Sequence, residues 1–444
     1  MGFEHILTIE TDPEQGTIYE EGWQSWSPSM TYRLTDRPWR APSESSYRGD
    51  YGGTRPAPPD GSFSGEGLLA VEPGNGAPVT VIAADTAAES VPRIHARLTG
   101  TSLQITADGA VSVTEDNRDL VGALGEFGTR FATAAGGTAI QPAPTIWSSW
   151  YHYFTDVTQN DMFENIDAIA AADLPVDVVQ LDDGYQTEIG DWLTLSDRFD
   201  SLADVVARIK DSGRRAGIWI APFLAGSKSR VFAEHPEWII GGPDEPAWAN
   251  ENWNQTTFGL DTTHPGFQAY LAEVFGHFTD LGFDFFKTDF IYGAALDGAR
   301  HDDVSAVAAY RLGLDLIRAG IGESYLLGCG APSLASVGKV DAMRVSPDTG
   351  PRFEPANNDM SKPSGRAAIA TSIGRSWQHG RFWVNDPDCL IVRPEVENRQ
   401  ALAEYIRSVG GLRGSSDRIA ALDDWGMATT RELLSSVPAP VPFS

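Results

Sequence analysis

A chain of 444 residues with a formal net charge of −28 and a pI near 4.5 lacks the basic surface that nucleic acids and anionic membranes require of their partners. Its two cysteines, Cys329 and Cys389, are too few for a disulfide framework and form no Cys/His spacing typical of a metal site. The N-terminus has no basic region followed by an apolar run, so we expect a cytoplasmic protein that binds neither nucleic acid nor a membrane.

The acidic surplus is accompanied by a scarcity of lysine, because only five of the 33 basic residues are lysines. Such a surface is typical of proteins that work in concentrated salt, where the repulsion between like charges is screened. An acidic proteome from a GC-rich genome would give the same composition. The composition therefore favours a halophilic protein but leaves this alternative open.

Residues 1–140 are expected to form an N-terminal domain of the β-sandwich type. Short alternating runs such as "HILTIET", "APVTVIAA" and "TSLQITA" are separated by clusters of Gly, Pro, Asp and Ser, which is the pattern of antiparallel strands joined by turns. Residues 40–67 are rich in Gly, Pro and Ser and are expected to be one long loop.

Residues 141–444 alternate short apolar runs with helical segments, which predicts a (β/α)8 barrel. The candidate strands lie within "TIWSSWYHYF", "VDVVQLDDGY", "RAGIWIAPF", "FDFFKTDFIY", "SYLLGCGA", "AMRVSPDT", "RFWVNDPDCL" and "GLRGSSD". The intervening helices have clear ends: one stops at Gly213, and another begins with Pro265 and stops at Gly282.

Polar residues follow most of these strands, where barrel enzymes place their chemistry. They are Asp182, Asp183, Lys287, Asp289, Cys329, Arg344, Asp348, Asn385, Asp386 and Asp388. A pocket rich in Asp indicates either metal binding or glycosidic chemistry. The eight histidines form no HxH or HExxH spacing, so a metal-dependent hydrolase is the less favoured class.

A retaining glycosidase needs two carboxyl groups, one ionised as nucleophile and one protonated as acid. In "FKTDF", Lys287 lies two residues before Asp289 on the same strand face, where it would hold that carboxylate as an ion. Asp348 in the turn "RVSPDTG" is the natural partner acid, and Arg344 would reach sugar hydroxyls or fix a carboxylate. The alternatives are a purely structural Lys–Asp pair and an ordinary Arg–Asp pair.

Adjacent carboxylates at Asp182 and Asp183 would accept hydrogen bonds from two neighbouring hydroxyls of one sugar, provided that the loop turns both toward the pocket. Alternatively, one of them caps the following helix. Trp26, Trp150 and Trp219 are candidates for stacking on a sugar, although a tryptophan is more often part of a core.

These stretches together resemble the α-galactosidases of glycoside hydrolase family 36, which shares a clan with family 27. The resemblance extends from about residue 22 to about residue 435 and rests on "WQSWSP", "SWYHYF", "QLDDGY", "GDW", "GIWIAPF", "FKTDF", "LLGCGAP", "DAMRVSPDT" and "RFWVNDPDCL", in family order. The resemblance implies an N-terminal β-sandwich, a (β/α)8 barrel and hydrolysis of terminal α-linked galactose with retained anomeric configuration.

By this resemblance, Asp289 matches the nucleophile and Asp348 the acid/base. Asp182 and Asp183 match the acidic pair that binds galactose hydroxyls. The other matches to the family's pocket are Trp26, Trp150, Trp219, Lys287, Cys329, Gly330 and Arg344. The cycle requires no metal, nucleotide or redox cofactor, and the partner is a small oligosaccharide such as melibiose or raffinose.

The chain departs from the family pattern in three places: a short N-terminal module, no sequence for the usual C-terminal β-domain, and the polar loop "TGPRFEPANNDM" after Asp348. A homo-oligomer would be one way to cover the apolar area that the missing domain exposes. Alternative functions are an α-N-acetylgalactosaminidase, a galactosyl-transferring relative and a non-catalytic sugar-binding protein.

Overall fold

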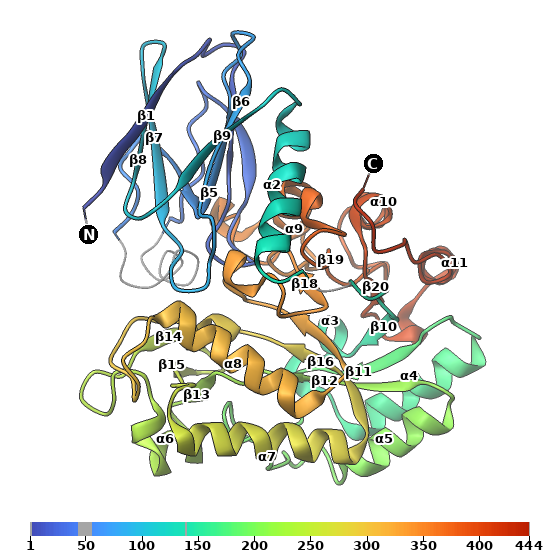
Figure 1. Cartoon of the computed structure of the whole chain (residues 1–444). Coiled ribbons are helices and arrows are strands. Elements are labelled where there is room, and N and C mark those ends of the chain that lie inside the picture. Colours follow the sequence, from blue (N-terminus) through green and yellow to red (C-terminus); the bar gives the residue numbers. More distant parts are fainter. Residues whose placement is uncertain (1, 43–55, 138–139, 444) are drawn as a thin grey trace.

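The computed structural model describes residues 2–42, 56–137 and 140–443. Its N-terminal strands are β1 (Glu4–Glu10), β2 (Thr17–Glu20), β3 (Met30–Arg33), β4 (Phe63–Glu66), β5 (Leu68–Glu72), β6 (Val79–Ala83), β7 (Arg93–Thr99), β8 (Ser102–Ala107) and β9 (Ser112–Asp116). They form two antiparallel sheets, in the orders β1-β8-β7-β4 and β3-β2-β5-β6-β9, which lie above the rest of the molecule in Figure 1.

The two sheets bury their apolar faces against each other. In β8, Leu103, Ile105 and Ala107 are buried while Gln104 is exposed, as expected for a strand with one face toward a core. Leu103 and Ile105 share this core with residues of the second sheet such as Ile82. The N-terminal part therefore has the expected sandwich of antiparallel sheets.

Two segments of this part differ from the sequence-based expectation. Of the expected loop at residues 40–67, residues 43–55 lie outside the described residues, and Phe63–Glu66 is strand β4, which pairs with β7. Phe63 is buried in the sandwich core, so packing outweighs the loop-forming composition around it. Residues Leu120–Ala134 form helix α2, which had not been predicted, with a buried face that packs on the second sheet.

The eight predicted barrel strands are all present. They are β10 (Thr145–Ser148), β11 (Val178–Leu181), β12 (Arg215–Ile220), β16 (Phe283–Thr288), β17 (Tyr325–Gly328), β18 (Ala342–Arg344), β19 (Val384–Asp386) and β20 (Arg413–Ser415). They form one parallel sheet in the order β19-β18-β17-β16-β12-β11-β10-β20. A parallel bridge between Leu390 and Ser415 nearly closes it, and the (β/α)8 barrel is confirmed.

The helices cover the outside of the barrel and fill its loops. They are α3 (Trp150–Tyr153), α4 (Gln159–Ala171), α5 (Leu202–Asp211), α6 (Arg230–Glu234), α7 (Pro265–Leu281), α8 (Ala306–Ile321), α9 (Gly365–Gly374), α10 (Arg399–Val409) and α11 (Asp424–Leu434). The 3-10 turns are η1 (Phe154–Asp156), η2 (Pro236–Trp238), η3 (Ile291–Ala295), η4 (Leu334–Ser336), η5 (Ala356–Asn358), η6 (Ser376–Gln378) and η7 (Ile419–Ala421).

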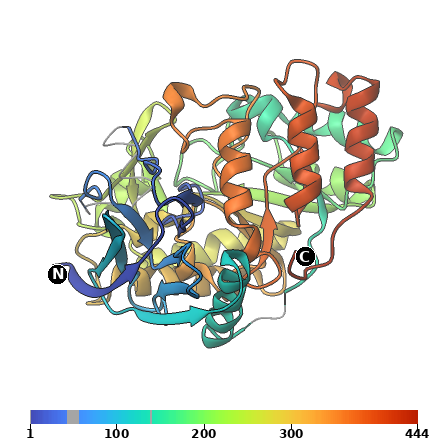
Figure 2. The ribbon, with the colours of Figure 1, turned by 90° about the horizontal axis from the view of Figure 1, so that it is seen from above.

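The ends of these helices follow local chemistry. Helix α7 begins at Pro265 and ends before Gly282, whose φ of 101° only glycine adopts without strain. Helix α5 ends just before Gly213, as predicted, and the hydroxyl of Ser201 caps its start. Figure 2 shows α9, α10 and α11 side by side along one flank of the barrel.

A small antiparallel sheet interrupts the barrel after its third strand and had not been predicted. Its strands are β13 (Leu224–Gly226), β14 (Trp248–Asn252) and β15 (Gln255–Gly259), in the order β13-β15-β14. Trp253 and Asn254 form the turn of the β14–β15 hairpin, with φ angles of 52° and 54°, as in the tight turns that favour asparagine. This hairpin reaches the carboxyl ends of the barrel strands.

The loop after β2 joins the N-terminal sheets to the barrel. The backbone of Gln24 pairs with Pro332, and the N–H of Ser25 donates to the carbonyl of Ala331 at 2.8 Å. Trp26 is therefore carried from the N-terminal sheets to the barrel opening. The division of the chain into domains near residue 140 stays a prediction.

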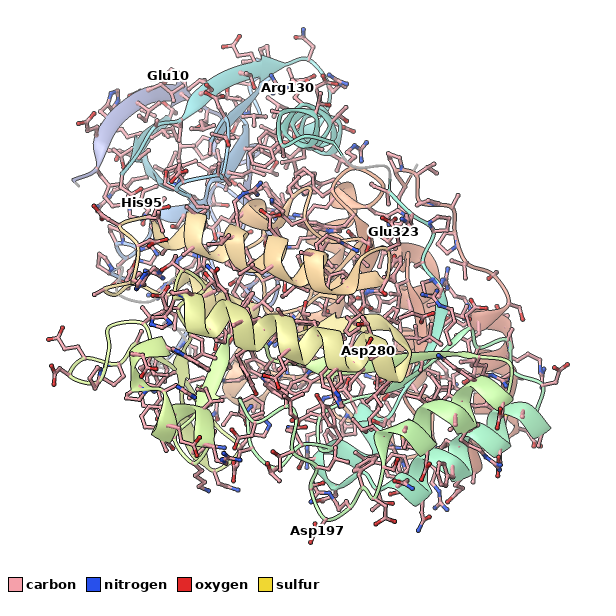
Figure 3. All side chains as sticks on the ribbon, turned by 60° about the horizontal axis from the view of Figure 1, so that its bottom comes forward. Glu10, His95, Arg130, Asp197, Asp280 and Glu323 are labelled. Atoms are coloured by element: carbon pink, nitrogen blue, oxygen red, sulfur yellow. The ribbon has the colours of Figure 1, made fainter. Side chains whose placement is uncertain are left out.

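Acidic side chains project from well-separated parts of the surface. Glu10 and Asp197 are exposed near opposite ends of the molecule in Figure 3, and Asp280 and Glu323 are exposed between them. None of the described helices combines the length and the apolar character that crossing a bilayer requires.

Candidate active site

A pocket of about 290 Å³ lies at the carboxyl ends of the barrel strands. Eight of the predicted site residues line it: Trp26, Trp150, Asp182, Asp183, Trp219, Lys287, Asp289 and Asp348. Residues from the N-terminal sheets, from the barrel loops and from the β14–β15 hairpin all contribute to its wall. Three further predicted residues, Cys329, Gly330 and Arg344, are not part of that lining.

Asp289 directly follows β16 and is 6% exposed. Its Oδ2 accepts a hydrogen bond from Trp219 Nε1 on the neighbouring strand β12 at 2.9 Å, and its Oδ1 accepts one from the backbone N–H of Phe290 at 2.8 Å. Burial raises the pKa of Asp289, whereas the charge of Lys287 and donors on Cys329 and Trp219 lower it in part. The carboxyl group is thus fixed at the pocket wall.

Lys287 has a nearer partner than the one expected. Its Nζ lies 2.9 Å from Asp182 Oδ2 and 3.9 Å from Asp289 Oδ2. Burial alone would lower the pKa of Lys287, but the charges of Asp182 and Asp289 raise it well above its usual value. The lysine is therefore a cation between two carboxylates. Its nearer partner, Asp182, follows β11, which is separated from β16 by β12 in the barrel.

The loop after β11 turns both members of the acidic pair toward the pocket. Asp182 Oδ2 accepts from Gln180 Nε2 at 2.7 Å as well as from Lys287. Asp183 Oδ1 accepts from Gln186 Nε2 at 2.6 Å, and its Oδ2 accepts from Trp253 Nε1 at 2.6 Å. Neither carboxylate caps a helix, since Ser201 caps the helix that follows.

Burial perturbs the electrostatics of Asp183. Burial raises the pKa of Asp183 to about 6, the charges of Asp182 and Asp289 add to this rise, and the donors on Gln186 and Trp253 oppose it. A hydrogen-bond donor from a ligand would stabilise the charged form further. The site can therefore bind hydroxyl groups through carboxylates that are already partly desolvated.

Asp348 lies in the loop after β18, and its side chain is 30% exposed. Its Oδ2 is 3.4 Å from Trp150 Nε1, and its Oδ1 forms an ion pair with Arg344. The other end of the Arg344 guanidinium binds Asp388 Oδ1 at 2.9 Å. Arg344 is therefore paired with two carboxylates.

Asp388 supports the turn that carries Asp348. Its Oδ2 accepts from the hydroxyl of Tyr151 and from the N–H of Thr349, the latter at 2.7 Å. Burial raises the pKa of Asp388, and the charge of Arg344 lowers it. Asp386 and Asn385, which the sequence also placed at strand ends, are not part of the pocket lining, and burial raises the pKa of Asp386 to about 6.

Cys329 and Gly330 lie behind Trp26 rather than in the pocket wall. Trp26 Nε1 donates to Cys329 Sγ at 3.3 Å, and a Cβ on Gly330 would lie 2.9 Å from the Trp26 ring. Gly330 also has a φ of 55°, so a larger residue there would displace the indole. Cys329 and Gly330 therefore fix the position of the Trp26 indole at the pocket.

The sequence missed the lining residues contributed by loops, by strand β14 and by the 3-10 turn η3. They are Gln24, Asn250, Glu251, Asn252, Trp253, Phe290, Tyr292, Pro347, Ser361, Lys362 and Pro363. The only local signal for Trp253 was the adjacent Asn254, a residue that tolerates the left-handed turn. Within the part of the chain that the structure describes, no three His, Cys, Asp or Glu side chains are grouped to hold a metal ion.

The model of the glycosyl hydrolases family 31 TIM-barrel domain matches residues 141–309, which is less than half of the chain. This segment includes β10 to β16 and therefore Asp182, Asp183 and Asp289. The match agrees with a barrel of the glycosyl hydrolase type. It differs from the family 36 that the sequence motifs resemble.

The α-galactosidase TtGalA from Thermus thermophilus is similar over nearly the whole chain. Its complex with p-nitrophenyl α-D-galactopyranoside has a TM-score of 0.79 and 25% identity, and the match covers 98% of this chain and 92% of that chain. Its complex with stachyose gives a TM-score of 0.80, 25% identity, and coverage of 97% and 92%.

Curated proteins match over shorter segments, and two of them serve as examples. α-Galactosidase AgaA from Geobacillus stearothermophilus is 26% identical over 152 residues, and α-xylosidase XylQ from Lactiplantibacillus pentosus is 25% identical over 170 residues. The matches cover 32% and 36% of this chain but only 20% and 22% of the relatives. The structure of AgaA, described as a family 36 enzyme, has a TM-score of 0.64 at 13% identity. The match covers 97% of this chain and 61% of that chain. At this identity, the likeness is evidence for a shared fold only. Together these likenesses support an enzyme that acts as a glycosidase.

Proposed function

We propose that this protein is a retaining α-galactosidase that removes terminal α-linked galactose from small oligosaccharides. The observation that carries the proposal is the pair Asp289 and Asp348, which line one pocket from the loops after β16 and β18. The similarity to TtGalA, whose complexes contain an α-galactoside and stachyose, supports galactose as the sugar. The resemblance to family 36 motifs supports the same reading.

In the first step, a carboxylate oxygen of Asp289 attacks the anomeric carbon, and the C–O bond to the leaving group breaks as Asp348 protonates the leaving oxygen. A covalent galactosyl-enzyme results. In the second step, Asp348 deprotonates a water molecule that attacks the same carbon and releases Asp289. Two inversions give net retention of configuration.

The remaining pocket residues would bind the sugar. Asp182 and Asp183 would accept hydrogen bonds from its hydroxyls, and Lys287 would donate to one while it holds Asp182. Trp26, Trp150 and Trp219 would pack on its apolar faces. Arg344 would act through Asp348, and Cys329 with Gly330 through Trp26.

Hydrolysis of p-nitrophenyl α-galactoside by the parent and by Asp289→Ala tests this proposal. The parent should be active and the variant should lose at least about 1,000-fold in kcat, since the covalent step has no substitute. Asp197→Ala, which removes an exposed carboxylate, is the matched control and should keep parental activity. NMR of the first product should show α-galactose; β-galactose or an active Asp289→Ala variant would exclude the retaining mechanism.

The family 31 match and the similarity to XylQ favour a second candidate, an α-xylosidase that uses the same two carboxyl groups. A screen of p-nitrophenyl α-glycosides that includes xylose, galactose and N-acetylgalactosamine would separate the candidates by kcat/KM.

A further inference from the structure

A groove of about 630 Å³ continues the pocket on the side of Trp150. It is lined by Trp150, Phe154, Thr155, Glu251, Asn252, Trp253, Asn254 and Gln255. Four of these residues, Trp150, Glu251, Asn252 and Trp253, line the pocket as well. The groove is therefore an open extension of the pocket.

The groove begins next to Asp348, the residue that would protonate the leaving group. Trp150 lines both spaces, and its Nε1 lies 3.4 Å from Asp348 Oδ2. Under the proposed mechanism, Asp348 protonates the oxygen that joins galactose to the rest of the substrate. That remainder must therefore leave the pocket near Trp150, where the groove begins.

Phe154 presents an aromatic ring to this groove at an energetic cost. Its side chain is 43% exposed and its ring centroid lies 5.2 Å from that of Trp150, in an edge-to-face arrangement. Its φ is 50° and its ψ is −142°, a backbone conformation that is strained for a bulky residue. Strain of this kind, together with an exposed ring, is more common at binding sites than in structural loops.

The opposite wall of the groove is polar and fixed. The exposed amides of Asn252 and Asn254 lie at the hairpin tip, and the indole of Trp253 ties this tip to Asp183 at 2.6 Å. A sugar offers an apolar face to an aromatic ring and hydroxyls to amides, so the two walls match the two sides of a sugar.

The segment that carries Phe154 is also fixed with respect to the acidic pair. A Cβ on Gly184 would lie only 2.7 Å from the carbonyl oxygen of Thr155, and Gly184 has a φ of 124°. Because Gly184 directly follows Asp183, the groove wall packs against the loop that would hold galactose. The groove and the pocket therefore form one continuous site of defined spacing.

We propose that this groove binds the leaving-group sugars of an oligosaccharide substrate, with Phe154 as the stacking platform. This assignment rests on the proposed α-galactosidase function. It gives the enzyme a preference for galactosides with more than one further sugar over galactosides with a small aglycone.

The test compares kcat/KM for stachyose, melibiose and p-nitrophenyl α-galactoside in the parent, Phe154→Ala and Phe154→Tyr. For Phe154→Ala, the loss of kcat/KM on stachyose should exceed the loss on the p-nitrophenyl substrate by at least about 5-fold. The reason is that the variant lacks the aromatic ring on which a leaving-group sugar would stack. Phe154→Tyr keeps the ring and should recover most of the difference. Phe3→Ala removes another exposed phenylalanine, on the N-terminal sheets, and should change no ratio.

The outcomes separate the two proposals. A parent that cleaves no α-galactoside would overturn the α-galactosidase function and the subsite with it. A parent that cleaves all three substrates, with equal losses for all three in Phe154→Ala, would overturn the subsite alone. Phe154 is exposed, so its replacement should leave the urea concentration at the unfolding midpoint unchanged, which a urea titration checks.

Discussion

Arg375 and Glu21 form a fully buried ion pair between residues that are 354 positions apart in the chain, with Nε and Oε1 at 2.9 Å. Glu21 Oε2 also accepts from the Tyr19 hydroxyl at 2.6 Å, and Arg375 also donates to the carbonyl of Gln24 at 3.0 Å. The pair ties the loop that carries Trp26 to the barrel. The position of Trp26 at the pocket thus depends on a contact made outside it.

Replacement of Arg375 by methionine should destabilise the protein strongly. The substitution leaves the carboxylate of Glu21 buried without its cation, which costs about 3–5 kcal/mol. The free energy of unfolding from urea titration measures this loss. In folded protein, the KM for p-nitrophenyl α-galactoside should also rise, because the loop with Trp26 loosens.

Arg407→Met is the matched control for this change. Arg407 pairs with Glu432 at the surface, where the two side chains are 34% and 63% exposed. Loss of such a pair costs about 1 kcal/mol or less. Equal losses in the two variants would show that the buried pair has no special role.

Replacement of Trp253 by phenylalanine should weaken substrate binding more at pH 6 than at pH 8. The indole donor lowers the pKa of Asp183, which burial raises to about 6. Without this donor the pKa rises further, so at pH 6 a larger fraction of Asp183 is protonated and unable to accept from a sugar hydroxyl. We expect KM to rise about 10-fold at pH 6, the value of one lost hydrogen bond to a charged group.

Trp248→Phe provides the comparison, because its indole lies in the same hairpin but donates to the exposed Glu251 at 3.1 Å. Its KM should stay near the parental value at both pH values. The role of Trp253 is rejected if both variants show the same pH dependence of KM.

Replacement of Asp386 by asparagine should change how stability depends on pH. Burial raises the pKa of Asp386 from 3.8 to about 6, so the folded state binds a proton more tightly than the unfolded state. The contribution of Asp386 to stability is therefore fully present below about pH 4 and is lost as pH rises through 6. Asparagine does not ionise, so the Asp386→Asn variant should not lose this stability as pH rises.

Urea titrations at pH 4.5, 6 and 7.5 measure the effect. Relative to the parent, Asp386→Asn should become more stable as pH rises, by at most about 3 kcal/mol for a shift of this size. A difference between the two proteins that is constant over this range would contradict the buried, neutral Asp386.

The acidic, lysine-poor composition and the halophile hypothesis drawn from it make a further prediction. With a net charge of −28, the folded protein should gain at least about 1 kcal/mol of unfolding free energy between 0.05 M and 2 M KCl, because salt screens the repulsion between surface carboxylates. An equal concentration series of sucrose controls for general solute effects. Full activity and unchanged stability at low salt would remove the halophile hypothesis.

Sequence alone was sufficient for the barrel and for the acidic residues of the pocket that follow its strands. Asp182 and Asp289 could be found because each directly follows a short apolar strand, and Asp348 because it lies in the turn beyond another. The carboxyl ends of parallel strands meet at one edge. This information is local. The spacing of apolar residues predicts the strand, and the end of the strand predicts where the following polar residue lies in the barrel.

Local information could not supply the partners of these residues. Lys287 and Asp289 are neighbours in the chain, yet the ammonium of Lys287 is nearer to Asp182 because the barrel brings the ends of β11 and β16 together. Trp253 reaches Asp183 through a hairpin whose strands carry only a weak alternating pattern.

The sequence by itself determined the fold class and the acidic residues at the strand ends, since both depend on periods and spacings of a few residues. Only the tertiary structure decided which groups neutralise the buried charges: Asp182 for Lys287, Asp348 and Asp388 for Arg344, and Glu21 for Arg375. The physical reason is that a buried charge requires a partner at about 3 Å, and the chain brings that partner from any distance along the sequence.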